Sequence, residues 1–149
     1  SCVWNPGGKG LKDQIESVQR WFTRRIPSLS SLPYAERLSM LDLEPLELRR
    51  LRFDLTLYYK ILNNHTSFKP EDVFTLYIPP ESTRSKLPTL QKPTKSNEKL
   101  RSSFFYRNID AWNALPPSIT NATSIFAFKR LIKSFDFTQF VYATTDNFN

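Results

Sequence analysis

Hydrophobic residues recur at helical spacing near the start of the chain. At about 100° of rotation per residue, five of them share one narrow face, with Trp21 at its edge. They are Leu11, Ile15, Val18, Phe22 and Ile26. Because Pro27 then interrupts the pattern, the sequence predicts a helix over residues 11–26 whose apolar face packs inside a core.

Two further helical segments follow, over residues 33–41 and 45–63, each opening at a proline that the first helical turn tolerates. The third segment has two apolar stripes on opposite sides, so we expect it to lie between two packing layers. One stripe holds Leu48, Leu51, Leu55, Tyr58, Tyr59 and Leu62, and the other holds Leu46, Phe53, Leu57 and Ile61. A basic edge runs between them through Arg49, Arg52, Thr56 and Lys60.

The helical period is lost after Asn63. The β-prone run over residues 73–78, VFTLYI, precedes Pro79-Pro80 and predicts a short strand or extended arm. A short helix is predicted after Ser102-Ser103, ending before Pro116-Pro117, and a last helix over residues 124–135. We therefore predict a mainly α fold, a small bundle of about five helices with a short extended or β segment in the middle. Its parts are residues 1–63 and residues 64–149.

Composition favours an acidic partner. The 21 Lys and Arg residues exceed the 14 Asp and Glu residues, for a net charge of +7, and such a field attracts polyanions such as nucleic acid or acidic membrane surfaces. The single cysteine, Cys2, excludes an internal disulfide, and no apolar run is long enough to span a bilayer. We expect an intracellular location, in the nucleus or the cytoplasm, and no membrane partner.

Candidate chemistry is sparse. His65 is the only histidine, which excludes a multi-histidine metal site, and the GGKG segment lacks the remainder of a phosphate-binding loop. No adjacent aspartates are present to hold a pair of divalent ions. We therefore predict no catalytic residue, no metal, no cofactor and no small-molecule substrate.

The basic residues are the candidates that remain. Residues 84–107 carry seven Lys and Arg against Glu98 alone. Solvated charge on a helix surface is the ordinary interpretation of such residues, and contact with phosphates is the alternative. The candidate nucleic-acid-binding residues are Arg20, Arg24, Arg49, Arg52, Lys60, Arg84, Lys86, Lys92, Lys95, Lys99, Arg101 and Arg107.

Several blocks occur in a specific order and spacing: VWNP, IESVQRWFTRRI, LPYAERL, LELRRLRFDL with YKIL, and FFYRNIDAWNALP. From Val3 to Phe135 the chain resembles the C-terminal part of reverse transcriptases from non-LTR (LINE-type) retrotransposons of the Jockey-like group. The resemblance implies a helical thumb over residues 1–63, which grips the template–primer duplex, and a C-terminal extension. It also implies an upstream polymerase core, which would hold the catalytic aspartates.

We therefore expect a non-catalytic fragment of an RNA-directed DNA polymerase that positions RNA, an RNA–DNA hybrid or DNA. The start at Ser1, without a methionine, is consistent with a piece of a longer chain. One alternative is a module that docks on the polymerase core of the same polypeptide without binding nucleic acid. Another is the relic of a decayed element.

Overall fold

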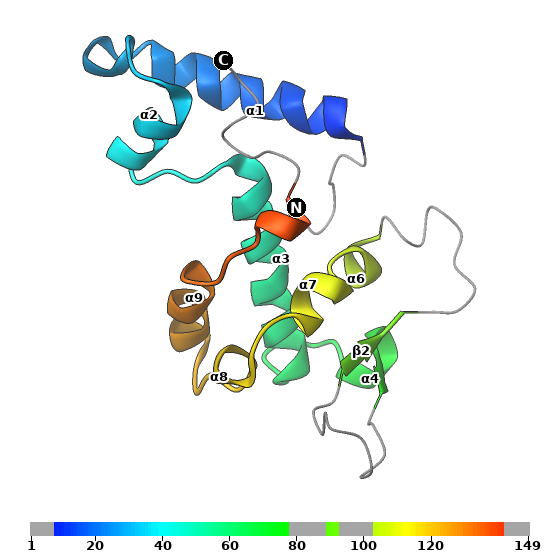
Figure 1. The fold of residues 1–149 in the computed structure, drawn as a ribbon. Helices are drawn as coiled ribbons and strands as arrows, with labels where there is room; N and C mark the ends of the chain where they lie inside the picture. The colour runs from blue at the N-terminus through cyan, green and yellow to red at the C-terminus, as the bar shows by residue number, and fades with distance from the viewer. Residues whose placement is uncertain (1–7, 78–88, 93–102, 142–149) are drawn as a thin grey trace. The chain divides into compact units, whose positions relative to one another are not determined.

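The computed structural model describes residues 8–77, 89–92 and 103–141. It consists mainly of helices, with one small two-stranded antiparallel sheet in the middle of the element order (Figure 1), which confirms the mainly α fold with a β segment in the middle. The long helices are α1 (Lys9–Arg24), α3 (Leu46–Leu62) and α9 (Ile125–Lys133). The shorter elements are η1 (Pro27–Leu29), α2 (Tyr34–Met40), α4 (Pro70–Val73), β1 (Thr75–Tyr77), β2 (Thr89–Gln91), α6 (Phe104–Arg107), α7 (Ile109–Asn113), α8 (Pro117–Thr120) and η2 (Thr138–Phe140).

The chain forms two compact units. The α1–α2 unit comprises Trp4–Leu51 and Asp136–Asn149. The α6–α9 unit comprises Ser1–Val3 and Arg52–Phe135. Helix α3 contributes its first turns to the α1–α2 unit and the rest of its length to the α6–α9 unit.

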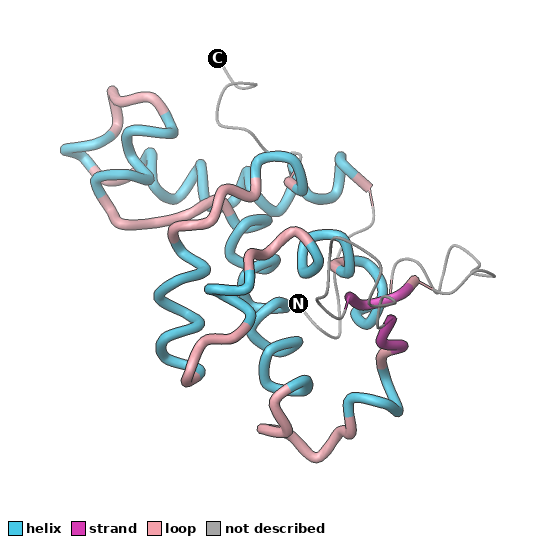
Figure 2. Tube along the Cα trace, turned by 60° about the horizontal axis from the view of Figure 1, so that its bottom comes forward, coloured by secondary structure: helices cyan, strands magenta, loops and turns pink. Residues whose placement is uncertain are grey.

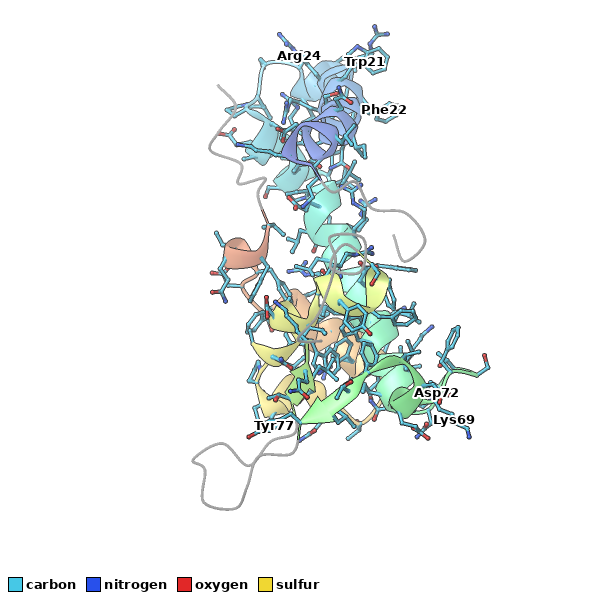
Figure 3. The ribbon with its side chains drawn as sticks, turned by 90° about the vertical axis from the view of Figure 1, so that its right-hand side faces the viewer. Trp21, Phe22, Arg24, Lys69, Asp72 and Tyr77 are labelled. Atoms are coloured by element: carbon cyan, nitrogen blue, oxygen red, sulfur yellow. The ribbon has the colours of Figure 1, made fainter. Side chains whose placement is uncertain are left out.

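Helix α1 forms where its periodicity predicts it, but it packs through its polar face. Its buried residues are Glu16 and Thr23, whereas Leu11, Val18 and Phe22 of the apolar stripe are exposed. In Figure 3 the side chains of Trp21 and Phe22 project away from the helices. The prediction that the stripe lies in the core is therefore wrong within this chain. Periodicity identifies side chains that share a face, but not which face finds a partner.

Hydrogen bonds explain why the polar face of α1 is the buried one. The Glu16 carboxylate accepts from the Tyr34 hydroxyl at 2.5 Å and from the backbone N–H of Leu46, in the first turn of α3, at 2.8 Å. Gln19 donates to the Tyr34 hydroxyl at 3.1 Å and to the carbonyl of Glu44 at 3.0 Å. Each of these groups would lose its partner if α1 turned its apolar stripe inward, and an unpaired buried polar group is costly.

A second set of contacts completes the α1–α2 unit. Lys12 of α1 pairs with Glu47 of α3 at 2.6 Å. The buried Arg37 of α2 donates to the hydroxyl of Thr23 at 3.3 Å and to the carbonyl of Leu32 at 2.5 Å. Apolar packing in this unit comes from Leu29, Tyr34, Leu38, Leu51 and Phe137, all of which are buried.

Helix α3 buries one of its two predicted stripes well, at Leu51, Leu55, Tyr58 and Tyr59. The opposite stripe is divided, because Ile61 is buried but Phe53 is 59% exposed. The expectation that α3 is covered by two packing layers is therefore wrong at Phe53. Polar residues are also buried along α3, since Asp54 is 2% exposed and pairs with the side chain of Arg107.

Aromatic rings form the centre of the α6–α9 unit. Tyr58 lies within 4.7 Å of Phe74, 5.3 Å of Phe104 and 6.0 Å of Trp112, measured between ring centroids. Its hydroxyl donates to the carbonyl of Phe104 at 2.9 Å, and burial raises the pKa of Tyr58 well above its ordinary value. Tyr59 stacks on Phe128 of α9 at 4.5 Å. A single turn of α3 thus joins the middle of the chain to its last long helix.

The predicted extended segment is confirmed in part. Val73 ends α4, which starts at Pro70 with Glu71 and Asp72 in its first turn, and β1 begins at Thr75. β1 pairs with β2 in antiparallel register, with Leu76 opposite Leu90 (Figure 2). Asn113 of α7 secures β2, because its side-chain amide accepts from the N–H of Leu90 and donates to the carbonyl of Leu90, both at 2.9 Å.

The predicted C-terminal helices form, but the first of them is broken. Asn108, with φ −110° and ψ 12°, separates α6 from α7, and Phe104 of α6 and Ile109 and Trp112 of α7 are buried. Ser124 caps α9 through a 3.1 Å bond from the N–H of Ala127. Among the described residues, no helix is long and apolar enough to cross a bilayer.

Candidate nucleic-acid interface

The net charge of the chain lies entirely in one unit. Counted on the sequence, the α6–α9 unit has thirteen Lys and Arg against six Asp and Glu. The α1–α2 unit has eight of each. A surface that attracts polyanions is therefore expected on the α6–α9 unit and not on the other.

Helix α9 carries the clearest group of exposed cations. Lys129, Arg130 and Lys133 are all exposed, while Phe128 and Ile132 on the opposite side are buried. No acidic residue occurs in the sequence between Asp110 and Asp136. Within the described part of the chain, these three side chains form no ion pair with a carboxylate. They are therefore available to an anionic ligand.

Three residues of the predicted basic edge of α3, Arg52, Thr56 and Lys60, belong to the same unit as α9. Arg52 donates from Nη2 to the carbonyl of Lys133, the last residue of α9, at 2.8 Å. A cation at a helix C-terminus opposes the negative end of the helix dipole, so Arg52 stabilises α9. Thr56 is buried and bonds back to the carbonyl of Arg52 at 2.7 Å, and Lys60 is half-buried. The edge is thus divided between internal contacts and solvent.

Arg107 has an internal partner. Its guanidinium donates to Oδ2 of Asp54 from Nη2 at 2.5 Å and from Nε at 3.2 Å. Asn108 donates to the same oxygen at 2.9 Å. The side chains of Arg107 and Asp54 are only 12% and 3% exposed. This geometry indicates a structural ion pair that holds α6 to α3, so we leave Arg107 out of the interface.

Lys92 also faces a carboxylate, because its ammonium group pairs with Asp110 at the surface. This pair is open to solvent, with both side chains more than half exposed. The remaining candidates of the basic cluster, Arg84, Lys86, Lys95, Lys99 and Arg101, lie outside the described residues.

The three candidates on the α1–α2 unit lie in different surroundings. Arg20 is half-buried on the polar face of α1, with its guanidinium carbon 5.0 Å from the centre of the Tyr34 ring. Arg24 and Arg49 are exposed (Arg24 in Figure 3). The structure therefore does not gather these three into one basic surface with each other.

The exposed residues of α9 are not among the candidates predicted from the sequence, neither the three cations Lys129, Arg130 and Lys133 nor Phe126. Phe126 of α9 is 78% exposed, although phenylalanine is normally buried. It precedes Lys129, Arg130 and Lys133 by three, four and seven positions. Helical spacing along the sequence would have placed all four of these residues on one face.

No group of three metal-ligating side chains occurs among the described residues. No family model, no curated protein and no solved structure matches this chain. The likeness to Jockey-like reverse transcriptases therefore stays a prediction.

Proposed function

We propose that this chain is a non-catalytic part of a retroelement reverse transcriptase, in the nucleus or the cytoplasm, and that its α6–α9 unit positions nucleic acid. One observation carries the proposal: the whole excess of positive charge resides in that unit. Phosphate neutralisation by Lys and Arg supplies most of the sequence-independent affinity for nucleic acid. Such contacts fix the register of a strand or duplex without reading its sequence.

The residues assigned to this role are selected from the cations of the α6–α9 unit. They comprise Lys129, Arg130 and Lys133 of α9, with Lys60 of α3 and the basic cluster of residues 84–101. Arg52 and Arg107 support them by fixing the C-terminus of α9 and the position of α6. The target is a polyanion with regularly spaced phosphates, such as an RNA–DNA hybrid.

A salt titration tests the proposal. The full chain is titrated with a fluorescent RNA–DNA hybrid between about 50 and 200 mM salt, where a protein that makes several phosphate contacts loses affinity steeply. Replacing Lys129, Arg130 and Lys133 together by Glu should weaken binding and reduce the salt slope by about 2 to 3. Circular dichroism checks that the variant keeps its helices.

The chain offers a control of equal charge. Lys9 and Arg24 of α1 and its C-cap residue Arg25 are exposed, in the neutral unit. Replacing these three by Glu changes the net charge as much as the α9 variant does. We expect the α1 variant to retain most of the binding. Equal losses in both variants, or an affinity that does not respond to salt, would contradict the proposal.

A second function is favoured by the exposed apolar face of α1. This face presents Leu11, Val18, Trp21 and Phe22, of which Trp21 is 56% and Phe22 67% exposed. The exposed Arg25 lies beside it, with its guanidinium carbon 3.9 Å from the centre of the Trp21 ring. Contiguous apolar surface rimmed by charge is typical of protein contacts. Charge complementarity calls for an apolar partner surface with an acidic rim, and we propose the polymerase core of the same polypeptide as that partner.

Substitution of Phe22 by Asp tests the docking role. Binding to a polymerase core supplied as a separate protein should be lost in this variant and kept in the control Phe68→Asp, at an exposed position of the other unit. Sedimentation of the chain alone shows whether the face pairs with a second copy. A stable dimer broken by Phe22→Asp would assign the face to self-association and not to the core.

A further inference from the structure

The outer face of α9 combines one aromatic ring with three cations. Phe126, Lys129, Arg130 and Lys133 are spaced at i, i+3, i+4 and i+7, which places them along one stripe about 10 Å long. All four side chains are exposed. The helix thus presents a flat apolar ring and positive charge to the same region of solvent.

The opposite side of α9 prevents this face from turning inward. Phe128 is fully buried, stacked on Tyr59 at 4.5 Å and lying 5.9 Å from Trp112. Ile132 is 2% exposed. Ser124 caps the start of the helix, and Arg52 holds its last carbonyl. Figure 1 shows α9 beside α3. Rotation that buried Phe126 would break each of these contacts, so the ring is held outward.

We propose that this face, consisting of Phe126, Lys129, Arg130 and Lys133, binds single-stranded nucleic acid. A base stacks on the ring of Phe126, and the neighbouring phosphates meet the three cations. Grooves that combine basic residues with exposed aromatic rings bind single strands in this way. The bases of a duplex are stacked on one another, so a duplex would contact the three cations through its phosphates but would not stack on the ring of Phe126. The inference rests on the proposed function and specifies the form of nucleic acid that this site takes.

An anionic membrane is the other ligand that a basic, aromatic helix face could attract. A membrane-surface helix inserts a continuous apolar face into the lipid boundary. In α9 that face is already occupied, because Phe128 and Ile132 pack inside the α6–α9 unit. On the outer face only the ring of Phe126 then remains among these four residues. One ring is enough to stack on a base but gives little apolar surface to insert into a membrane.

Three substitutions in the full chain test the site. Phe126→Ala removes the ring, Phe126→Leu keeps an apolar side chain without a π face, and Phe126→Trp enlarges the stacking surface. Phe68→Ala is the matched control, since Phe68 is also exposed in this unit but precedes the acidic pair Glu71 and Asp72. Each variant is titrated with labelled oligothymidine of about ten nucleotides and with an RNA–DNA hybrid, by fluorescence anisotropy.

We expect Phe126→Ala and Phe126→Leu to weaken oligothymidine binding by about tenfold and to leave hybrid binding nearly unchanged. Phe126→Trp should restore or strengthen binding, with quenching of the new indole. Phe68→Ala should change neither. Normal single-strand binding by Phe126→Ala, with hybrid binding intact, would overturn this inference and leave the proposed function standing. Failure of the parent chain to bind either nucleic acid would refute the proposed function.

Vesicles of phosphatidylserine and phosphatidylcholine complete the test. A membrane role predicts that the parent chain and Phe126→Leu bind these vesicles, that Phe126→Ala does not, and that oligothymidine is not bound. This set of results would assign the face to a membrane. That result would overturn the inference.

Discussion

The hydroxyl of Tyr34 donates a hydrogen bond of 2.5 Å to the carboxylate of Glu16, eighteen positions earlier in the chain. The second oxygen of that carboxylate accepts the N–H of Leu46 at 2.8 Å. A single acidic side chain therefore joins α1, α2 and the first turn of α3. A carboxylate at a helix N-terminus also opposes the positive end of the dipole, so Glu16 acts as a remote cap for α3.

Replacing Glu16 by Gln should destabilise the α1–α2 unit by about 1–3 kcal/mol. The amide can accept from Tyr34 through one atom, but its NH2 group then faces the N–H of Leu46, donor against donor. Urea unfolding followed by circular dichroism measures the loss. The control is Glu36→Gln at an exposed position of α2. Similar midpoints for both variants would show that the buried carboxylate is not needed.

Alkaline pH should weaken the fold through its tyrosines. Burial, and secondly the bond to Glu16, raise the pKa of Tyr34 above its ordinary value, and burial does the same at Tyr58. Unfolded tyrosine loses its proton near pH 10, whereas the folded state keeps it. Stability from these groups is therefore complete below about pH 10 and declines as the pH rises above it.

Unfolding midpoints at about pH 8 and about pH 11 measure this decline. The variant Tyr34→Phe should show a smaller decline than the parent chain, and the part that remains is assigned to Tyr58. A parent chain whose midpoint is unchanged over this range would show that neither hydroxyl is held in its neutral form.

The buried ion pair of Arg107 with Asp54 should stabilise the fold more than the exposed pair of Lys92 with Asp110 does. Removing one partner of a buried pair leaves an uncompensated charge, so Asp54→Ala should cost about 3–5 kcal/mol. The Lys92 and Asp110 pair is open to solvent, and Asp110→Ala should cost at most about 1 kcal/mol. Thermal unfolding of both variants makes the comparison. A double-mutant cycle with Arg107→Ala shows whether the cost at Asp54 arises from that pair.

The orientation of α1 predicts that its apolar stripe contributes little to the stability of the isolated chain. Phe22→Ser should change the free energy of unfolding by no more than about 0.5 kcal/mol, as for other exposed positions. Leu38→Ala, at a buried position of α2, should cost about 2–5 kcal/mol. If Phe22→Ser proved as damaging as Leu38→Ala, the stripe would be internal and the polar face would be the exposed one.

The helices were predictable because their signals are local. Pro27, Pro33 and Pro45 divide the first segment correctly, and the period of residues 124–135 gives both the buried Phe128 and the exposed Lys129 of α9. Local rules describe which residues share a face and where a helix stops. These rules apply without information about which residues pack against the helix.

The orientation of α1 and the fate of the arginines depend on distant residues. The sequence around Glu16 does not predict its hydrogen bonds to Tyr34 and Leu46. The sequence around Arg107 does not predict its ion pair with Asp54, which lies 53 positions away. Charge alone placed Arg107 with the phosphate-binding candidates. Of the candidate site, the sequence predicted the basic character, whereas the choice of α9 needed the observation that Phe126 and three cations are exposed on one face.

The contact between Asn113 and Leu90 restricts the chemistry permitted at position 113. One side chain meets both the donor and the acceptor of a single backbone residue, as a neighbouring strand would. A carboxamide has a donor and an acceptor on separate atoms, whereas an ionised carboxylate can only accept. Spontaneous deamidation of Asn113 would set a carboxylate against the carbonyl of Leu90, so chemical ageing at this one position would release β2 from α7.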